Sequence, residues 1–161
     1  MTEPIAACIF SEDRVYRYNW ARRVSNQPGR MLCIGVNPSK ADEDRSDNTV
    51  TRCCNFARRE GYGVLEMANL NAFRATDPKI MRAASDPVGP DNDRYLLEAI
   101  RRCDVIVVAW GIHGAFMGRD LEVFRLIGQE RKNAFCFGLT NGGFPRHPSR
   151  LANNTELVRY S

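Results

Sequence analysis

The chain has 161 residues, of which 43% are hydrophobic and 26% charged, and these values indicate one globular domain, residues 1–161, with a buried core. No run approaches 18 apolar residues and no basic region precedes an apolar run at the N-terminus, so we expect no membrane helix, no secretory signal and a cytoplasmic location. The net charge of +4 permits nucleic-acid binding without requiring it, because 19 acidic residues dilute the 23 basic ones.

The chain begins with an expected β-hairpin, in which residues 5–10 and 14–19 form two strands around a polar turn. Four mainly apolar runs then predict buried strands, at residues 31–36, 64–70, 105–110 and 134–139. Between them, helical spacing of apolar residues predicts three amphipathic helices, which contain residues 50–57, 96–103 and 121–127.

Two of these helices have predicted boundary residues. Asp91 is a candidate N-cap of the second helix, and Gly61 has the place of the left-handed residue that follows the first. We expect a long loop around Pro87 and a helical turn in the tail after Leu151. The alternation predicts an α/β protein with three layers, α/β/α, and a four-stranded, mainly parallel central sheet beside the hairpin.

The six cysteines lie at positions 8, 33, 53, 54, 103 and 136 and show neither Cys-x-x-Cys nor zinc-ligand spacing. We interpret them as small buried hydrophobic residues. Asp42, Asp44 and Asp47 precede a predicted helix, but they lack the glycine and the distal glutamate of a calcium loop. We therefore expect helix caps there, and no metal or cofactor. The chain also lacks a phosphate-binding loop, a dinucleotide fingerprint and a nucleophile elbow, which excludes ATPase, dinucleotide-dependent and serine-hydrolase functions.

Two polar, proline-containing loops follow predicted strands: residues 35–39 (Gly-Val-Asn-Pro-Ser) and residues 147–151 (His-Pro-Ser-Arg-Leu). Ligands of open α/β sheets bind beyond the carboxyl ends of the strands, so the fold can bring both loops to one cleft. The Asn37 amide can hold a water or a polar ligand edge, or it can bond its own backbone in a turn. His147 can act as an acid, a base or a donor to developing negative charge, or it is a loop histidine held by a backbone hydrogen bond. His113 also follows a strand, with packing or a helix start as its alternative role.

Four short motifs, taken in order, resemble the uracil-DNA glycosylase superfamily. They are Gly35-Val36-Asn37-Pro38, Asn69-Leu70, Trp110-Gly111 and His147-Pro148-Ser149-Arg150-Leu151, each after a predicted strand. The resemblance implies a four-stranded parallel sheet with helices on both sides. It places Asn37 where the superfamily orients the attacking water and His147 where it supports the leaving base. Asn69 resembles the base-reading asparagine, with Asn71 as the rival, and Leu151 matches the leucine that wedges into the DNA stack.

Nearly the whole chain also resembles an uncharacterised bacterial and phage family, domain of unknown function 1643. The matching segments are residues 37–42, 48–49, 69–78, 109–111 and 145–148. This resemblance implies no established activity. The chain departs from the glycosylase pattern at Ser39, which replaces a glycine, and at Arg150, which replaces a small residue or proline. The Tyr-His pair after the first motif, a clear stacking aromatic and the cluster cysteines of the thermophilic branch are missing.

Two functions follow as alternatives. The first is an N-glycosidase that acts on a modified or damaged base in nucleic acid, DNA foremost, after flipping it out of the stack. The second is a non-catalytic nucleotide- or nucleic-acid-binding protein, or a small-molecule nucleoside hydrolase, on the same fold. The sequence leaves the oligomeric state open.

The candidate catalytic residues are Asn37 and His147. The candidate substrate-binding residues are Gly35, Pro38, Ser39, Asn69, Asn71, Arg74, Trp110, His113, Ser149, Arg150 and Leu151. Under the first alternative, Arg74, Arg146 and Arg150 contact phosphates.

Overall fold

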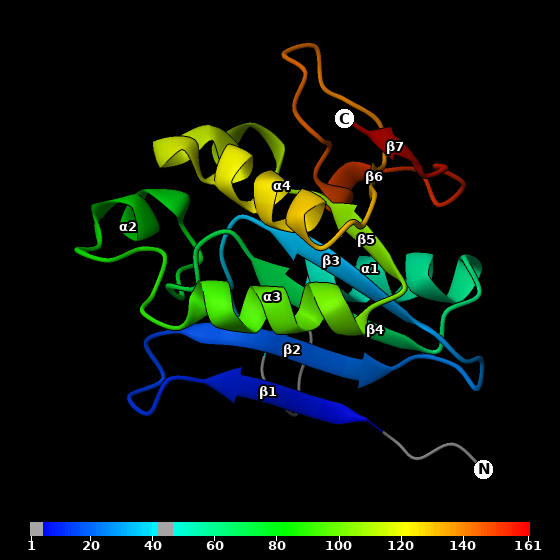
Figure 1. Ribbon diagram of the computed structural model, residues 1–161, viewed down its shortest axis with the longest axis horizontal. Helices are drawn as coiled ribbons and strands as arrows, with labels where there is room; N and C mark the ends of the chain where they lie inside the picture. The colour runs from blue at the N-terminus through cyan, green and yellow to red at the C-terminus, as the bar shows by residue number, and fades with distance from the viewer. Residues whose placement is uncertain (1–4, 42–46) are drawn as a thin grey trace.

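Seven strands form one sheet in the computed structural model, which describes residues 5–41 and 47–161 (Figure 1). In chain order the strands are β1 (Ala6–Phe10), β2 (Arg17–Arg23), β3 (Arg30–Gly35), β4 (Val64–Asn69), β5 (Val105–Val108), β6 (Ala134–Cys136) and β7 (Val158–Tyr160). Their spatial order is β1-β2-β4-β3-β5-β6-β7. The helices are α1 (Asn48–Arg59), α2 (Pro78–Ala83), α3 (Asn92–Arg102) and α4 (Arg119–Gln129), with 3₁₀ turns η1 (Gly111–Gly118) and η2 (Pro148–Arg150).

The four predicted apolar strands are β4, β3, β5 and β6, and they pair in parallel at the centre of the sheet. The α/β class is therefore confirmed, but a sheet of only four strands is wrong. β2 pairs antiparallel with β4, so the hairpin extends the sheet at one edge. At the other edge β7 pairs antiparallel with β6, in the tail where a helical turn was expected. β2 and β7 thus form hydrogen bonds with backbone groups of β4 and β6 that would otherwise be unpaired at the edges of the parallel sheet.

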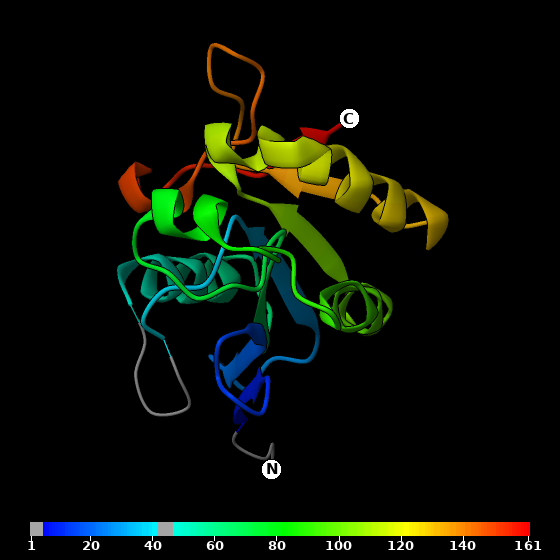
Figure 2. The same cartoon turned by 90° about the vertical axis from the view of Figure 1, so that its left-hand side faces the viewer.

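Helices cover both faces of the sheet (Figure 2). Helix α1 buries Val50, Cys53 and Phe56 in one apolar cluster, which also contains Met31 of β3. Helices α3 and α4 pack on the opposite face, in a second cluster that contains residues from α3, α4 and the central strands, namely Leu96, Ile100, Val123, Ile127, Leu32, Ile34, Ile106 and Val108. Alternate residues of the central strands point into these two clusters, because side chains alternate across a strand.

The boundaries of α1 follow from its flanking residues. The Asp47 carboxylate accepts the Val50 N–H at 2.9 Å as N-cap. Gly61 has φ of +84° just beyond the helix, as predicted. Asp91 is the N-cap residue of α3, but its side chain makes no capping hydrogen bond.

The helices differ from the sequence pattern in two places. Leu121 belongs to the apolar spacing that predicted the helix over residues 121–127, but it is 66% exposed and lies outside the buried face of α4. The segment expected as a long loop contains the short helix α2, in which Asp77 caps the Lys79 N–H and Pro78 begins the helix.

All six cysteines are free thiols, and five of them are buried. The Cys33 and Cys53 sulfurs lie 3.5 Å apart between β3 and α1. Within the described ranges no group of three or more His, Cys, Asp or Glu side chains is arranged to hold a metal ion, and Asp42 and Asp44 lie outside those ranges. No helix of the described part of the chain combines the length and apolarity needed to cross a membrane.

Candidate functional site

A cavity of about 480 Å³ lies at the carboxyl ends of β3, β4 and β5, within the size range of small-molecule sites. The two predicted loops meet there, since Asn37 and His147 both line it. Eight of the candidate residues line this cavity, namely Gly35, Asn37, Pro38, Ser39, Asn69, Trp110, His113 and His147. The wall also contains Arg17, Asp47, Thr49, Thr76 and Thr140, none of which was predicted as a site residue.

The Asn37 side chain is oriented by two backbone carbonyls. Its Nδ2 donates to the Ala75 oxygen at 2.7 Å and to the Pro38 oxygen at 3.2 Å. Carbonyl oxygens only accept, so the amide nitrogen must face them. Its Oδ1 accepts no hydrogen bond from the described residues, and Asn37 lines the cavity. The backbone bond and the ligand-facing role, considered as alternatives from the sequence, are therefore compatible.

The His147 ring is fixed by Ser149, two residues later. Its Nδ1 accepts the Ser149 N–H at 3.2 Å and lies 2.9 Å from the Ser149 Oγ. A backbone N–H can only donate, so the neutral ring has its proton on Nε2. Partial desolvation lowers the pKa of His147; the charge of Asp47 opposes this shift and His113 adds to it. The site therefore holds a neutral imidazole with an Nε2–H donor.

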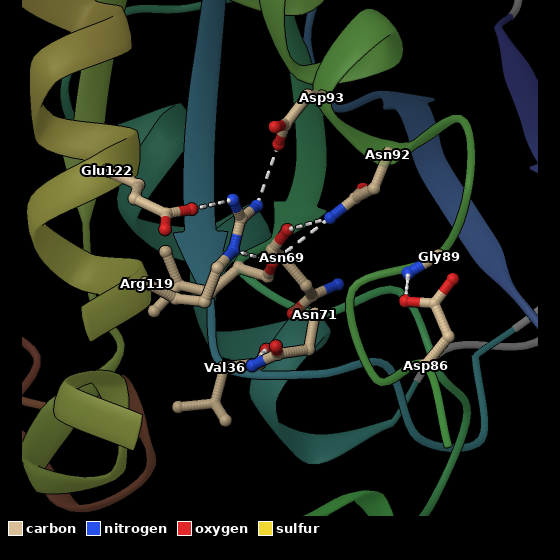
Figure 3. Close-up of polar contacts among 10 residues, drawn as sticks. Val36, Asn69, Asn71, Asp86, Gly89, Asn92, Asp93, Arg119 and Glu122 are labelled. Atoms are coloured by element: carbon tan, nitrogen blue, oxygen red, sulfur yellow. Dashed lines mark hydrogen bonds and ion pairs between the residues drawn. The ribbon is translucent and has the colours of Figure 1, made fainter. Parts of the chain in front are cut away.

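Asn69 ends β4 and is only 4% exposed. Its Nδ2 is buried without a hydrogen-bond partner, although the side chain lines the cavity. Buried amide groups are normally hydrogen-bonded, so this donor indicates a place for a ligand or water acceptor. Its main-chain oxygen accepts from Asn92 Nδ2 at 3.0 Å (Figure 3).

A buried arginine holds the end of β4 in place. Arg119, at the start of α4, donates from Nε to the Leu70 oxygen at 3.0 Å, and its other nitrogens contact Asp93 and Glu122 at 2.8 Å (Figure 3). The two carboxylates compensate the charge of a side chain removed from water. This cluster fixes the main chain at Leu70, the residue after Asn69. Sequence reasoning missed it, because an arginine at a helix start carries no distinctive signal.

Trp110 follows β5 and forms another part of the wall. It is 1% exposed, and its Nε1 is buried without a partner. A β-carbon on Gly114 would stand 2.1 Å from Trp110 Cδ1, so the 3₁₀ turn can pack here only with glycine at that position. His113 is exposed in the same turn, with its Nδ1 3.3 Å from Arg82 Nη1.

Five candidate residues, Leu151 among them, lie outside the cavity wall. Asn71 is buried and donates to the Val36 oxygen at 3.3 Å. Arg74 donates to the Arg14 oxygen and stacks over Phe10. Ser149 contacts the His147 ring, and Arg150 is exposed on η2.

Leu151 is placed differently from its expected role as a wedge. It is 5% exposed and belongs to the apolar cluster beneath α1. Its carbonyl and that of Pro148 accept hydrogen bonds from Arg52, which ties this segment to the helix. In this arrangement Leu151 contributes to the core and presents no apolar wedge to solvent.

Two of the unpredicted wall residues are charged. Asp47 was interpreted only as a possible helix cap, but its carboxylate also lines the cavity. Arg17 lies on β2 and is buried, with its Nη1 2.9 Å from the Ala41 oxygen. β2 contains three arginines, so its sequence carries no signal that singles out Arg17.

Together these features define an α/β protein with a cavity, lined by several polar side chains, at the carboxyl ends of its parallel strands. The profile of the family described as "Protein of unknown function (DUF1643)" matches residues 17–149, and the chain belongs to this family. Searches of curated proteins and of solved structures found no significant match. The likeness to uracil-DNA glycosylases stays a prediction.

Proposed function

We propose that this protein hydrolyses an N-glycosidic bond, with the base held in the cavity. One observation carries the proposal: an acceptor, Asn37 Oδ1, and the oriented imidazole of His147 belong to one cavity wall. Cleavage of a base from a sugar needs a positioned water and a donor to the departing base. The ordered motifs shared with the glycosylase superfamily support the same assignment.

In the proposed reaction the bond between the anomeric carbon and the base nitrogen breaks first, and its electron pair leaves with the base. His147 Nε2–H donates a hydrogen bond to the negative charge on that base. A water that donates a hydrogen bond to Asn37 Oδ1 then attacks the cationic sugar, and its proton passes to solvent while the base takes one up. The buried Nδ2 of Asn69 donates to an acceptor on the base edge.

Asp47 supplies the negative charge that such a sugar cation requires. It is the one carboxylate on the cavity wall among the described residues. Opposite charges attract strongly across a partly desolvated site. The carboxylate therefore stabilises the transition state without having to remove a proton.

Binding without catalysis is the second candidate, and the chemistry of Asn37 favours it. An amide oxygen has almost no basicity, so it cannot take a proton from the water. If the glycosidic bond does not break before water attacks, the same cavity only binds its ligand.

The test is release of free base, measured by mass spectrometry. The substrates are DNA, RNA and free nucleosides that carry uracil, hypoxanthine, xanthine and alkylated bases. We expect release that Asn37→Ala and His147→Ala each reduce by about a hundredfold or more, as for other transition-state donors. Asn141→Ala, an exposed amide outside the cavity wall, is the matched control. No release from any substrate by folded protein would contradict the proposal, and saturable binding of a base would then support the second candidate.

A further inference from the structure

We propose that the substrate is a free nucleoside, a base on an unphosphorylated sugar, and not a base within a nucleic-acid strand. This inference rests on the proposed function and names its substrate class. It combines the chemistry of the cavity wall with the position of the segment that follows His147.

Asp47 is the first observation. Its Oδ1 accepts the Val50 N–H at 2.9 Å, which fixes the carboxylate at the start of α1. Its second oxygen accepts no hydrogen bond from the described residues, and the side chain lines the cavity. A carboxylate accepts hydrogen bonds from sugar hydroxyls, as the ribose-binding acidic residue of dinucleotide folds does. The same charge repels a phosphate group.

The cavity wall points independently to a ligand. Asn69 lines the same cavity and is more than nine-tenths buried, and its Nδ2 has no hydrogen-bond partner among the described residues. This donor suits an acceptor on a base, whereas Asp47 suits hydroxyl donors. A nucleoside carries both kinds of group on one small molecule, and the cavity has the volume of a small-molecule site.

Hydroxyl side chains complete the surroundings of a sugar. Four of them line the cavity, from Ser39, Thr49, Thr76 and Thr140. Ser39 Oγ lies 3.4 Å from Thr76 Oγ1, so these two come from adjacent loops at one place. Each hydroxyl can both donate and accept, which suits the hydroxyl groups of a free sugar.

Among the described residues, the leucine expected to open a duplex is not exposed at this site. Enzymes that flip a base need to fill or stabilise the gap in the stack, often with an apolar side chain. Leu151, the residue that would do this, is buried in the core. The arginines expected at phosphates, Arg74, Arg146 and Arg150, do not line the cavity.

The experiment compares base release from three forms of each base. The forms are the nucleoside, its 5′-monophosphate and an oligonucleotide that contains it, single-stranded and duplex. We expect kcat/KM for the nucleoside to exceed that for the monophosphate by about tenfold or more, since a phosphate near Asp47 is repelled. We expect no release from the oligonucleotides.

Asp47→Asn tests the role of the carboxylate. Asparagine caps helices as well as aspartate, so α1 should remain folded. We expect lower kcat/KM for the nucleoside and a smaller ratio of nucleoside to monophosphate. The matched control is Asp91→Asn, at the exposed N-cap of α3, which should leave both unchanged.

The outcomes separate the two proposals. Release from oligonucleotides but not from nucleosides would overturn the free-nucleoside inference and leave the glycosidase proposal standing. No release from any form would overturn the glycosidase proposal itself. If the ratio of kcat/KM for the nucleoside to kcat/KM for the monophosphate were unchanged in Asp47→Asn, Asp47 would not recognise the sugar.

Discussion

Gly35 and Asn69 are paired across β3 and β4, and a β-carbon on Gly35 would stand 3.0 Å from Asn69 Oδ1. Both residues are the last of their strands, and both line the cavity. Because Gly35 has no side chain, the Asn69 amide can occupy this position. This pair links the register of the parallel sheet to the chemistry of the cavity wall.

The first prediction concerns Gly35→Ala. The added methyl group must displace the Asn69 amide, so base release or base binding should fall by about tenfold or more, the usual cost of a small displacement at a binding group. The free energy of unfolding should fall by about 1 kcal/mol. Gly128→Ala in α4 is the control, because a β-carbon there meets nothing within 4 Å and should stabilise the helix. Equal binding by wild type and Gly35→Ala would contradict the role of this pair.

The second prediction concerns the pH dependence of His147. Its folded pKa lies below the ordinary value of 6.5, because the ring is partly desolvated. As the pH falls, the unfolded chain therefore binds the proton first, and stability decreases from pH 6.5 through the folded pKa. Activity that needs the neutral ring should stay constant down to pH 6.5 and fall below it. NMR titration of the ring protons measures the pKa, and His113→Ala should raise it, because His113 contributes to the lowering.

The third prediction distinguishes a core role from a wedge role for Leu151. Leu151→Ala should lower the free energy of unfolding by about 2–4 kcal/mol, because it leaves a cavity in a packed cluster. Urea unfolding followed by circular dichroism measures this change. Leu139→Ala, at an exposed leucine, should change it by less than about 0.5 kcal/mol. If Leu151→Ala left the stability unchanged but abolished activity on duplex DNA alone, the wedge role of Leu151 would be supported instead.

The fourth prediction concerns Glu66, a 1% exposed carboxylate in the middle of β4. It accepts from Arg30 Nη1 at 2.9 Å, from Arg102 Nη2 at 2.6 Å and from Asn19 Nδ2 at 3.0 Å. Burial acts to raise the pKa of Glu66, but the hydrogen bonds and charge of Arg102, with Asn19, lower it overall. Glu66→Gln should cost about 3 kcal/mol, because it leaves the arginines without their partner.

The pH dependence of stability provides a second test of Glu66. Its folded pKa lies below the unfolded value of 4.5, so its stabilisation is present above pH 4.5 and is lost as the pH falls through the folded pKa. Denaturant titrations between pH 3 and 6 should show a steeper loss for wild type than for Glu66→Gln. Glu98→Gln, at an exposed carboxylate, is the control. Parallel pH profiles for wild type and Glu66→Gln would contradict this account.

Much of the central fold could be predicted from local patterns. The strands β3 to β6 are mainly apolar because both faces of the sheet are covered, and α1 shows the helical spacing of a half-buried helix. The two loops that meet at the cavity could also be predicted, because parallel strands all end at one edge. The expected class, α/β, and the family follow from these local features.

The edges of the sheet could not be predicted in this way. β7 has only three residues, and whether such a segment forms a strand depends on the free edge of β6, not on its own composition. The hairpin likewise carries no signal that β2 pairs with β4. These contacts join residues far apart in the chain. Local periodicity indicates which side chains are buried, but it does not indicate which strands pair with each other.

The sequence alone therefore determined the alternation of strands and helices, a set of possible helix caps that includes Asp47, and the position of two polar loops after strands. Only the tertiary structure decided that Leu151 is buried, that Asp47 faces the cavity and that Asn69 holds an unpartnered donor. The physical reason is that secondary structure follows from the spacing of neighbouring residues. The direction of a loop side chain depends on what distant segments pack against it.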